Sequence, residues 1–153
     1  MIPGLEEANF LHLGSVHRNT FLNARTLLQS DLSSKKHPNL FFAGQITGVE
    51  GYTESASMGL YAASQILRRI HGLSKIDWQV ETAIGALVNY IMTVPHPTPS
   101  NINFGLLPAP RYNVKKRLPR HEMKDLKKQF ACQSAEKRFT EFLPGLLSPV
   151  APC

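Results

Sequence analysis

The spacing of apolar residues predicts a strand, a loop and a helix as the central unit of this chain. Residues 40–43 are apolar without alternation, which is typical of a strand covered on both faces in a parallel sheet. Apolar residues then recur near period 3.6 as far as Ile70, with Thr53 or Ser55 as the expected N-cap and a glycine stop. Small residues in this helix allow close packing on a sheet: Ala56, Ser57, Gly59, Ala62 and Ala63.

Weaker patterns flank this unit. Residues 9–16 alternate loosely and predict a strand, and residues 24–32 predict a short helix or irregular segment. Residues 81–94 predict a mostly buried helix, and residues 120–143 predict an amphipathic one. The last ten residues contain three prolines and one glycine and are expected to be disordered. The alternation of strands and helices predicts an α/β fold.

The loop between the central strand and helix carries the candidate binding chemistry. Its glycines, Gly44, Gly48 and Gly51, allow positive φ or close approach of a ligand. Amides at the following helix N-terminus suit a phosphate or an electron-rich carbonyl oxygen. The spacing is neither a G-x-G-x-x-G dinucleotide fingerprint nor a P-loop. Spacing alone therefore leaves an ordinary strand-turn-helix connection as the alternative.

Two carboxylates accompany the loop. Glu54 is expected in the first turn of the helix, where the dipole favours an acidic side chain. Glu50 or Glu54 could instead carry a proton. Both interpretations are compatible with the sequence.

Basic residues are concentrated near the C-terminus. Residues 111–142 contain ten basic and four acidic residues, a balance of +6 that equals the formal net charge of the whole chain. Such a cluster can neutralise RNA phosphates, and the alternative is a solvated helix face. Because only Tyr112 and Phe130 interleave with this charge as candidate aromatics, specific base recognition by the tail is not expected.

Composition excludes several other classes. The 153 residues can bury one core, and no apolar run approaches the roughly 18 residues that a membrane span needs. The first residues do not have the basic-then-apolar pattern of a signal peptide, so we expect the cytoplasm as the compartment. The two cysteines, Cys132 and Cys153, form no disulfide framework and are interpreted as incidental reduced thiols. No metal-ligand spacing occurs, and we predict no metal.

Four blocks of residues point to one family. They are H-R-N-T-F-L-N at 17–23, F-F-A-G-Q-I-T-G-V-E-G-Y at 41–52, E-T-A-I-G-A-L-V-N-Y-I at 81–91 and N-I-N-F-G-L at 101–106. In this order they resemble the folate- and flavin-dependent tRNA (uracil-5-)-methyltransferases, the TrmFO family. The sister family of wobble-uridine flavoproteins, MnmG (GidA), is similar at the G-Q-I-x-G core but differs at Val49 and Glu50 and lacks the E-T-A-I-G block.

The resemblance implies a fold and a division into parts. It implies the C-terminal part of a Rossmann-like, glutathione-reductase-like FAD-binding domain with a basic helical tail. Residues 1–37 would end an inserted substrate-side domain, residues 38–110 would close the FAD-binding domain, and residues 111–153 would form the tail with its disordered C-terminus. The family's N-terminal fingerprint and catalytic cysteines have no counterpart here. We therefore expect a longer protein whose N-terminal half is the missing partner.

The resemblance also implies an activity for the intact protein. That activity is transfer of a one-carbon unit from methylenetetrahydrofolate to C5 of a T-loop uridine in tRNA, with FAD as cofactor and NADH or NADPH as electron source. The isolated chain is expected to be inactive. The alternatives are an MnmG-type modifying flavoprotein and a non-catalytic RNA-binding or structural remnant.

Site residues follow by the same resemblance. No catalytic residue is assigned within this chain. The residues expected to bind the cofactor are Gly44, Gln45, Gly48, Val49, Glu50, Gly51, Tyr52 and Ser55. Those expected to border the flavin face or the substrate are His17, Arg18 and Asn19. Those expected to bind tRNA are Lys115, Lys116, Arg117, Lys127 and Lys128.

Overall fold

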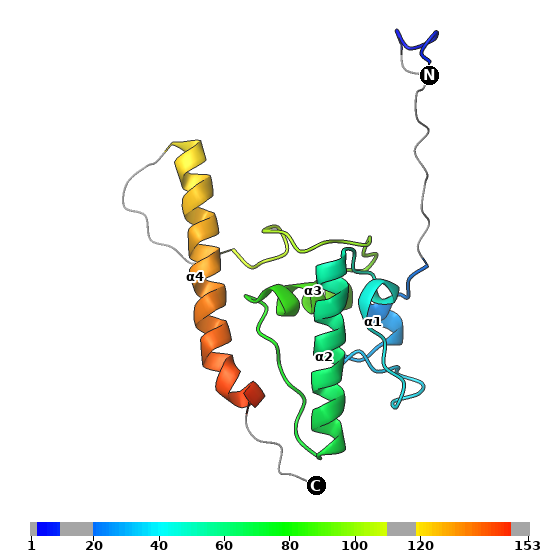
Figure 1. Ribbon diagram of the computed structural model, residues 1–153, viewed down its shortest axis with the longest axis vertical. Helices are drawn as coiled ribbons and strands as arrows, with labels where there is room; N and C mark the ends of the chain where they lie inside the picture. The colour runs from blue at the N-terminus through cyan, green and yellow to red at the C-terminus, as the bar shows by residue number, and fades with distance from the viewer. Residues whose placement is uncertain (1–2, 10–19, 110–118, 148–153) are drawn as a thin grey trace.

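The computed structural model describes residues 3–9, 20–109 and 119–147, with the side chains of residues 146 and 147 excepted. Within these ranges the elements are α1 (Ala24–Leu27), the 3-10 helix η1 (Gly44–Thr47), α2 (Tyr52–Ile70), α3 (Ala83–Thr93) and α4 (Arg120–Leu147) (Figure 1). Most of the strand expected over 9–16 lies outside the described residues. The division of the chain near residues 37 and 110 stays a prediction.

Helix α2 occupies the predicted range but begins differently from the prediction. Its N-cap is Gly51, with φ 95° and ψ 150°, and no side chain caps it. Thr53 and Ser55 both lie inside the first turn, so the prediction of either as N-cap is wrong. The predicted C-terminal end of α2 at a glycine is confirmed, since His71 is the C-cap and Gly72 has φ +64°. The glycine backbone, rather than a hydroxyl, sets the entry into this helix.

Helix α3 confirms the helix predicted over residues 81–94. Its first turn depends on Thr82 and Gly85. The Thr82 hydroxyl oxygen accepts a hydrogen bond from the Gly85 amide at 3.1 Å and donates to the Gln79 carbonyl at 2.7 Å. A Cβ on Gly85 would collide with the Gln79 carbonyl oxygen and would lie 2.7 Å from the Trp78 carbonyl oxygen. The tight turn therefore depends on a side-chain cap and on a residue without a Cβ.

The predicted strand at 40–43 is wrong for this chain. Phe41 forms one antiparallel bridge with Ser33, and the other β contacts of the described residues are also isolated bridges. Parallel strands need neighbouring strands that pair along their length, and no described segment supplies one. The described residues are mostly helical, and a Rossmann-like sheet is not confirmed.

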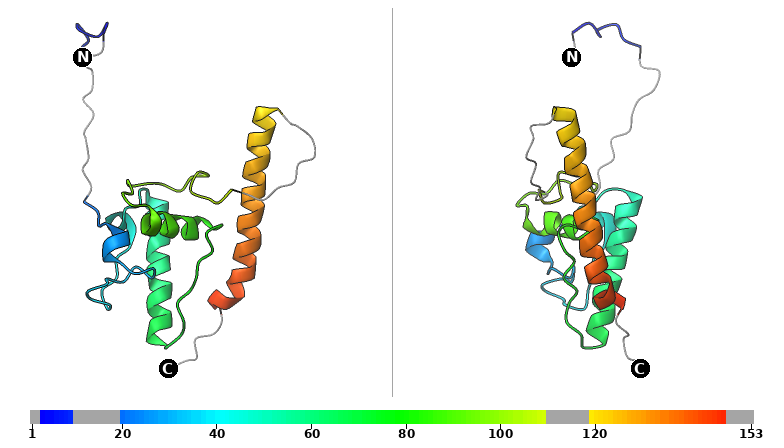
Figure 2. Two further views of the ribbon diagram at one scale, coloured as in Figure 1. Left: turned by 180° about the vertical axis from the view of Figure 1, so that it is seen from behind. Right: turned by 90° about the vertical axis from the view of Figure 1, so that its left-hand side faces the viewer.

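The core lies where α2 crosses α3, with α1 at its edge (Figure 2). Large side chains with less than 2% exposure come from each of these regions: Leu28, Leu32, Val49, Met58, Leu87 and Ile91. Full burial of one such side chain contributes about 1.5–3 kcal/mol. The amide of Gln65 exchanges two hydrogen bonds with the backbone of Ile76, at 2.7 and 3.0 Å, and so fixes the segment after α2 against that helix.

Helix α4 lies to one side of the other helices (Figures 1 and 2). The ring of Phe142 packs on Trp78 with centroids 5.1 Å apart, and Arg138 Nε lies 3.6 Å from Glu81 Oε1. The helix continues through Pro144 to Leu147, so the prediction of disorder is wrong for residues 144–147. Residues 148–153 lie outside the described residues. No helix in the described ranges has the length and apolar character to cross a bilayer.

A buried carboxylate joins the turn after α1 to the segment after α2. Asp31, 4% exposed, accepts hydrogen bonds from the Ser33 hydroxyl and amide at 2.6 and 3.0 Å. Lys75 Nζ lies 3.0 Å from its second oxygen. Burial acts to raise the pKa of Asp31, but the bonds from Ser33 and Lys75 outweigh it and hold the pKa below its ordinary value.

Replacing Asp31 by Asn is expected to destabilise the chain by about 1–3 kcal/mol at neutral pH, because Lys75 loses its charged partner. A lowered folded-state pKa gives stability that is present above the unfolded pKa and is lost as pH falls through the folded pKa. Urea denaturation from pH 7 down to about pH 3 measures both effects. The wild-type chain should lose more stability on acidification than the variant, and parallel pH profiles would contradict this role.

Candidate functional site

The loop before α2 is held in a single shape by its own backbone. Gly44, with φ +75°, opens η1, and its carbonyl accepts a hydrogen bond from the Thr47 hydroxyl at 2.7 Å. Gly48, with φ +92°, closes η1 by donating its amide to the Gln45 carbonyl at 3.0 Å. The predicted left-handed glycines are therefore confirmed, and they allow the chain to turn on both sides of η1.

Other sequence blocks meet at this loop. Leu22, in the described end of the 17–23 block, donates its amide to the Ile46 carbonyl at 2.8 Å. A Cβ on Gly48 would lie 3.5 Å from the Phe21 ring and 3.9 Å from Ile91 Cγ2 of α3. Segments far apart in the sequence thus converge on Gly48, where a Cβ would meet both at ordinary contact distance. The positive φ of Gly48, rather than crowding, favours glycine at this position.

The segment after α3 completes the junction. Val49 forms a parallel bridge with Ser100, and the Glu50 amide donates to the Ser100 carbonyl at 2.9 Å. Glu54, in the first turn of α2 as predicted, is 8% exposed and accepts the Ile102 amide at 3.1 Å. Its carboxylate therefore has a structural task in addition to its favourable place on the helix dipole.

Gly51 is required where these parts meet. With φ 95° and ψ 150°, it occupies a region of backbone conformation that is almost restricted to glycine. A Cβ there would collide with the Glu54 carboxylate and would lie 2.7 Å from Asn101 Nδ2. The glycine thus lets the Glu54 carboxylate approach the backbone at the start of α2.

The predicted cofactor residues differ in accessibility. Val49 is fully buried, and Gly44 and Gly48 are buried with it. Gln45 is exposed, Tyr52 is 99% exposed, and Glu50 and Ser55 are half-buried. The buried members set the shape of the loop. Exposed side chains and the uncapped first-turn amides of α2 form the face that a ligand could reach.

Several predicted site residues lie outside the described residues: His17, Arg18, Asn19, Lys115, Lys116 and Arg117. Cys132 is an exposed free thiol on α4, and Cys153 lies outside the described ranges. His96, in the segment after α3, is exposed. Among the described residues no group of three His, Cys, Asp or Glu side chains has the arrangement of a metal site.

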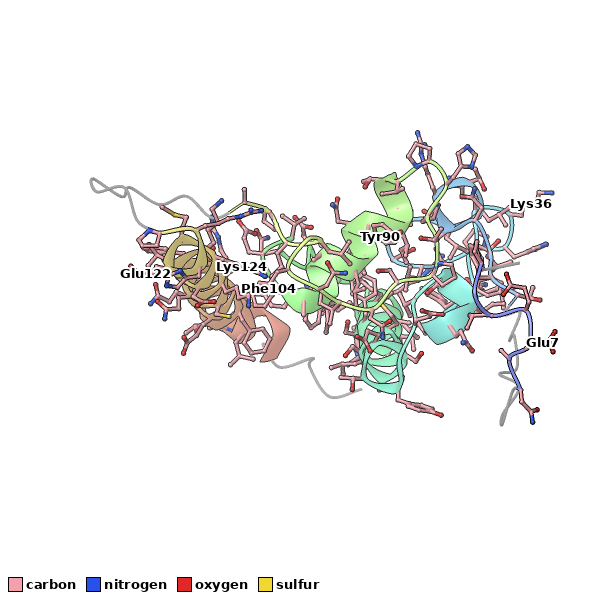
Figure 3. All side chains as sticks on the ribbon, turned by 90° about the horizontal axis from the view of Figure 1, so that it is seen from above. Glu7, Lys36, Tyr90, Phe104, Glu122 and Lys124 are labelled. Atoms are coloured by element: carbon pink, nitrogen blue, oxygen red, sulfur yellow. The ribbon has the colours of Figure 1, made fainter. Side chains whose placement is uncertain are left out.

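The basic tail forms a second candidate surface. A cavity of about 400 Å³ lies between α4 and residues 104–109. Its lining includes Lys124, Lys127 and Lys128 together with the half-exposed ring of Phe104. Lys128 Nζ lies 5.9 Å from the Phe104 ring centroid, and Figure 3 shows Phe104 beside α4 near Lys124. This geometry combines cations with an aromatic face.

Phe104 is not among the aromatics that the sequence places beside the charge. It lies sixteen residues before Arg120, where α4 begins, and only the fold brings it to the lysines. Phe130, which the sequence does place there, instead lines a neighbouring cavity of about 420 Å³ that also includes Glu81 and Arg138. Tyr112 lies outside the described residues.

The family of Glucose inhibited division protein A matches residues 1–74, which include the whole glycine loop and α2. The loop and α2 thus lie in the part of the chain that is similar to this family.

Relatives named methylenetetrahydrofolate–tRNA-(uracil-5-)-methyltransferase TrmFO match most of the chain. The protein from Natranaerobius thermophilus is 44% identical over 144 residues, which is 93% of this chain and 31% of that protein. The protein from Heliobacterium modesticaldum is 49% identical over 124 residues, 80% of this chain and 28% of that protein. The protein from Geobacter sulfurreducens is 51% identical over 119 residues, 76% of this chain and 27% of that protein.

The chain is therefore related to the TrmFO family, as its residue blocks predicted. It spans about 27–31% of the length of these relatives.

Replacing Gly51 by Ala is expected to lower the stability of the chain by about 1–3 kcal/mol, because a Cβ strains the backbone and displaces Glu54. Gly59→Ala is the matched control. A Cβ at Gly59 meets nothing within 4 Å, and alanine favours a helix interior over glycine by about 0.5–1 kcal/mol. Thermal and urea denaturation should give opposite signs for the two variants. Equal stabilities would contradict the role of Gly51.

Proposed function

We propose that this chain is the C-terminal portion of a methylenetetrahydrofolate- and FAD-dependent tRNA (uracil-5-)-methyltransferase that methylates C5 of the T-loop uridine. The observation that carries the proposal is the junction at Gly48 and Gly51. There the blocks that resemble TrmFO, at 17–23, 41–52, 81–91 and 101–106, meet through Leu22, Ile91, Ser100 and Ile102. Identity of 44–51% to proteins named TrmFO supports the same assignment.

The exposed part of the loop fits the edge of a flavin. Uncapped amides at the start of α2 suit an electron-rich carbonyl oxygen or a phosphate, and the nearby Gln45 amide can both donate and accept. Tyr52 presents a fully solvated aromatic side chain at the same end of α2. Gly44, Gly48 and Val49 act by shaping the loop, and Glu50 and Ser55 lie at its half-buried margin.

FAD, when bound, supplies the one-carbon transfer chemistry, and the protein orients it. This chain contributes the amides and side chains that hold the ribityl and isoalloxazine end. His17, Arg18 and Asn19 are proposed to border the reactive face. Methylenetetrahydrofolate is the proposed carbon donor, and NADH or NADPH is the proposed reductant. The rest of the FAD domain is the proposed partner, in a Rossmann-like fold, and the cytoplasm is the proposed compartment.

The basic tail is proposed to help dock tRNA. Its candidates are Lys115, Lys116, Arg117, Lys127 and Lys128, with Lys124 added by its place in the α4 cavity. Phe104 gives this surface an aromatic face on which an unstacked base could lie. The lysines supply the sequence-independent part of the affinity.

The isolated 153-residue chain is expected to bind FAD weakly or not at all and to show no methyl transfer. The loop presents one edge of a site, and the fingerprint that would hold the pyrophosphate is not in this sequence. Visible absorption of the purified chain and titration with FAD measure this directly. A tightly bound yellow flavin that copurifies with the chain alone would contradict the proposed division of the site.

Changing Lys115, Lys116, Lys127 and Lys128 together to Gln is expected to weaken tRNA binding and to flatten its salt dependence. The slope of log K against log salt should become shallower by about 0.7–0.9 for each phosphate that the variant no longer neutralises. Fluorescence anisotropy between low and moderate salt measures both quantities. Lys36→Gln is the control, since Lys36 lies at the opposite end of the molecule from Lys124 (Figure 3). An unchanged slope in the four-lysine variant would remove the tail from the tRNA site.

A further inference from the structure

Two adjoining cavities lie along one face of α4. We call the cavity of about 400 Å³ that contains Phe104 the lysine cavity, and the cavity of about 420 Å³ that contains Glu81 the Glu81 cavity. Both are lined by residues 107–109 and by Ala131 of α4. The cavities therefore meet where residues 107–109 reach α4.

The α4 residues that line the cavities share one face of the helix, with Phe130 at its margin. At 100° and 1.5 Å per residue, this face is about 120° wide and about 21 Å long. Glu122 and Asp125, in the same turns as the lysines, fall outside it. The residues of the face are Lys124, Lys127, Lys128, Ala131, Ser134 and Arg138.

The lysine cavity combines positive charge with an accessible aromatic ring. Phe104 is 51% exposed, and Lys128 Nζ lies 5.9 Å from its ring centroid. Lys128 Nζ also lies 3.9 Å from Asp125 Oδ1, but an exposed ion pair of this kind contributes little. Proteins that bind single-stranded nucleic acid combine cations for the phosphates with aromatic rings on which bases stack.

The Glu81 cavity differs in its chemistry. Arg138 lies between two carboxylates, with Nε 3.6 Å from Glu81 and Nη1 3.3 Å from Glu141, so its charge is compensated. Leu107 and Phe130 give the cavity apolar walls. A base fits these walls better than a phosphate does, because base edges can donate to a carboxylate and accept from a guanidinium.

Charge and size restrict what can occupy both cavities. The chain's own residues 110–118 contain four basic residues and no acidic one, so they do not complement the lysine cavity. An RNA duplex keeps its base faces stacked inside the helix, where Phe104 has no access to them. A single stacked strand advances about 3.4 Å per nucleotide, so about six nucleotides match the length of the α4 face.

We propose that the α4 face and its two cavities form a track for one unpaired RNA strand of about six nucleotides, with phosphates on the lysines, one base on Phe104 and another in the Glu81 cavity. The track selects unpaired RNA over duplex without reading an extended sequence. The proposal rests on the proposed function only for tRNA as the source of the strand.

The first test measures binding of a labelled six-nucleotide oligouridylate to the full 153-residue chain by fluorescence anisotropy at fixed salt. A blunt RNA duplex of twelve base pairs, with its higher charge, is the comparison. The single strand should bind at least about tenfold more tightly. Equal affinity, or tighter binding of the duplex, would overturn the proposal and leave the tail as a general electrostatic surface.

The second test removes the stacking face without changing charge. Phe104→Ala should weaken oligouridylate binding by at least about fivefold, the lower limit for loss of one stacked base, and Phe104→Tyr should retain it. The salt dependence should be the same in both variants, because the lysines remain. Undiminished binding by Phe104→Ala would contradict the track.

The third test fills the Glu81 cavity. Ser134→Phe should weaken oligouridylate binding by at least about fivefold, because the new ring occupies the place of a base. Gln133→Phe is the matched control, since Gln133 is exposed and lies about 160° around α4 from the centre of the face. Emission of Trp78, the single tryptophan, checks in each variant that Phe142 still packs on it. Equal binding by the two variants would contradict the track.

Two further outcomes separate this proposal from its alternatives. A six-residue polyglutamate peptide that binds as tightly as the oligouridylate would show that charge alone decides, and would overturn the proposal. Methyl transfer to tRNA by the chain assembled with the rest of the FAD domain tests the proposed function separately. Transfer without a preference for single strands would overturn the track alone, and a single-strand preference without transfer would support the track and count against the proposed function.

Discussion

The hydrogen bond from the Ile102 amide to the Glu54 carboxylate fixes the arrangement on which the rest of this chain depends. It joins the first turn of α2 to the segment after α3 across 48 residues of sequence. Burial of a carboxylate is unfavourable unless its oxygens are satisfied, so this bond commits both segments to one geometry. Gly51 makes the approach possible because it has no Cβ at the point where the carboxylate lies. The loop, the helix entry and the 100–102 segment are consequently one structural unit.

This unit leaves two kinds of surface unsatisfied. The start of α2 presents amides that no side chain caps, and the outer face of the same helix presents leucine, isoleucine and small residues to solvent. Both features are unfavourable in a chain that functions alone, and both are explained if further polypeptide and a flavin complete them. Helix α4 of the basic tail contacts the other helices' unit elsewhere, through Phe142 on Trp78 and Arg138 with Glu81. These contacts leave both surfaces uncovered.

Sequence periodicity was sufficient where a segment's structure depends on local interactions. The helix to Ile70, the helix around Ala83–Thr93 and the positive φ of Gly44, Gly48 and Gly51 were all predicted, since helix propensity and glycine geometry are local properties. A buried apolar run predicts the 40–43 strand, but a strand forms only where a neighbour pairs along its length. Among the described residues, Ser33 gives this segment one isolated antiparallel bridge, at Phe41. The predicted N-cap of α2 is wrong because the helix begins after Gly51, whose backbone conformation takes the place of the expected Thr or Ser hydroxyl cap. Phe104 and the contact of Glu54 with Ile102 depend on long-range folding, which no periodicity reports.

The most direct measurement is a crystal structure of this chain assembled with FAD and with the rest of the FAD domain from a TrmFO relative. The account predicts that an oxygen of the flavin or its ribityl chain lies within about 3.2 Å of a backbone amide between Gly51 and Ser55, with the Glu54 to Ile102 bond intact. A flavin bound elsewhere, with the start of α2 covered by protein side chains, would contradict the account.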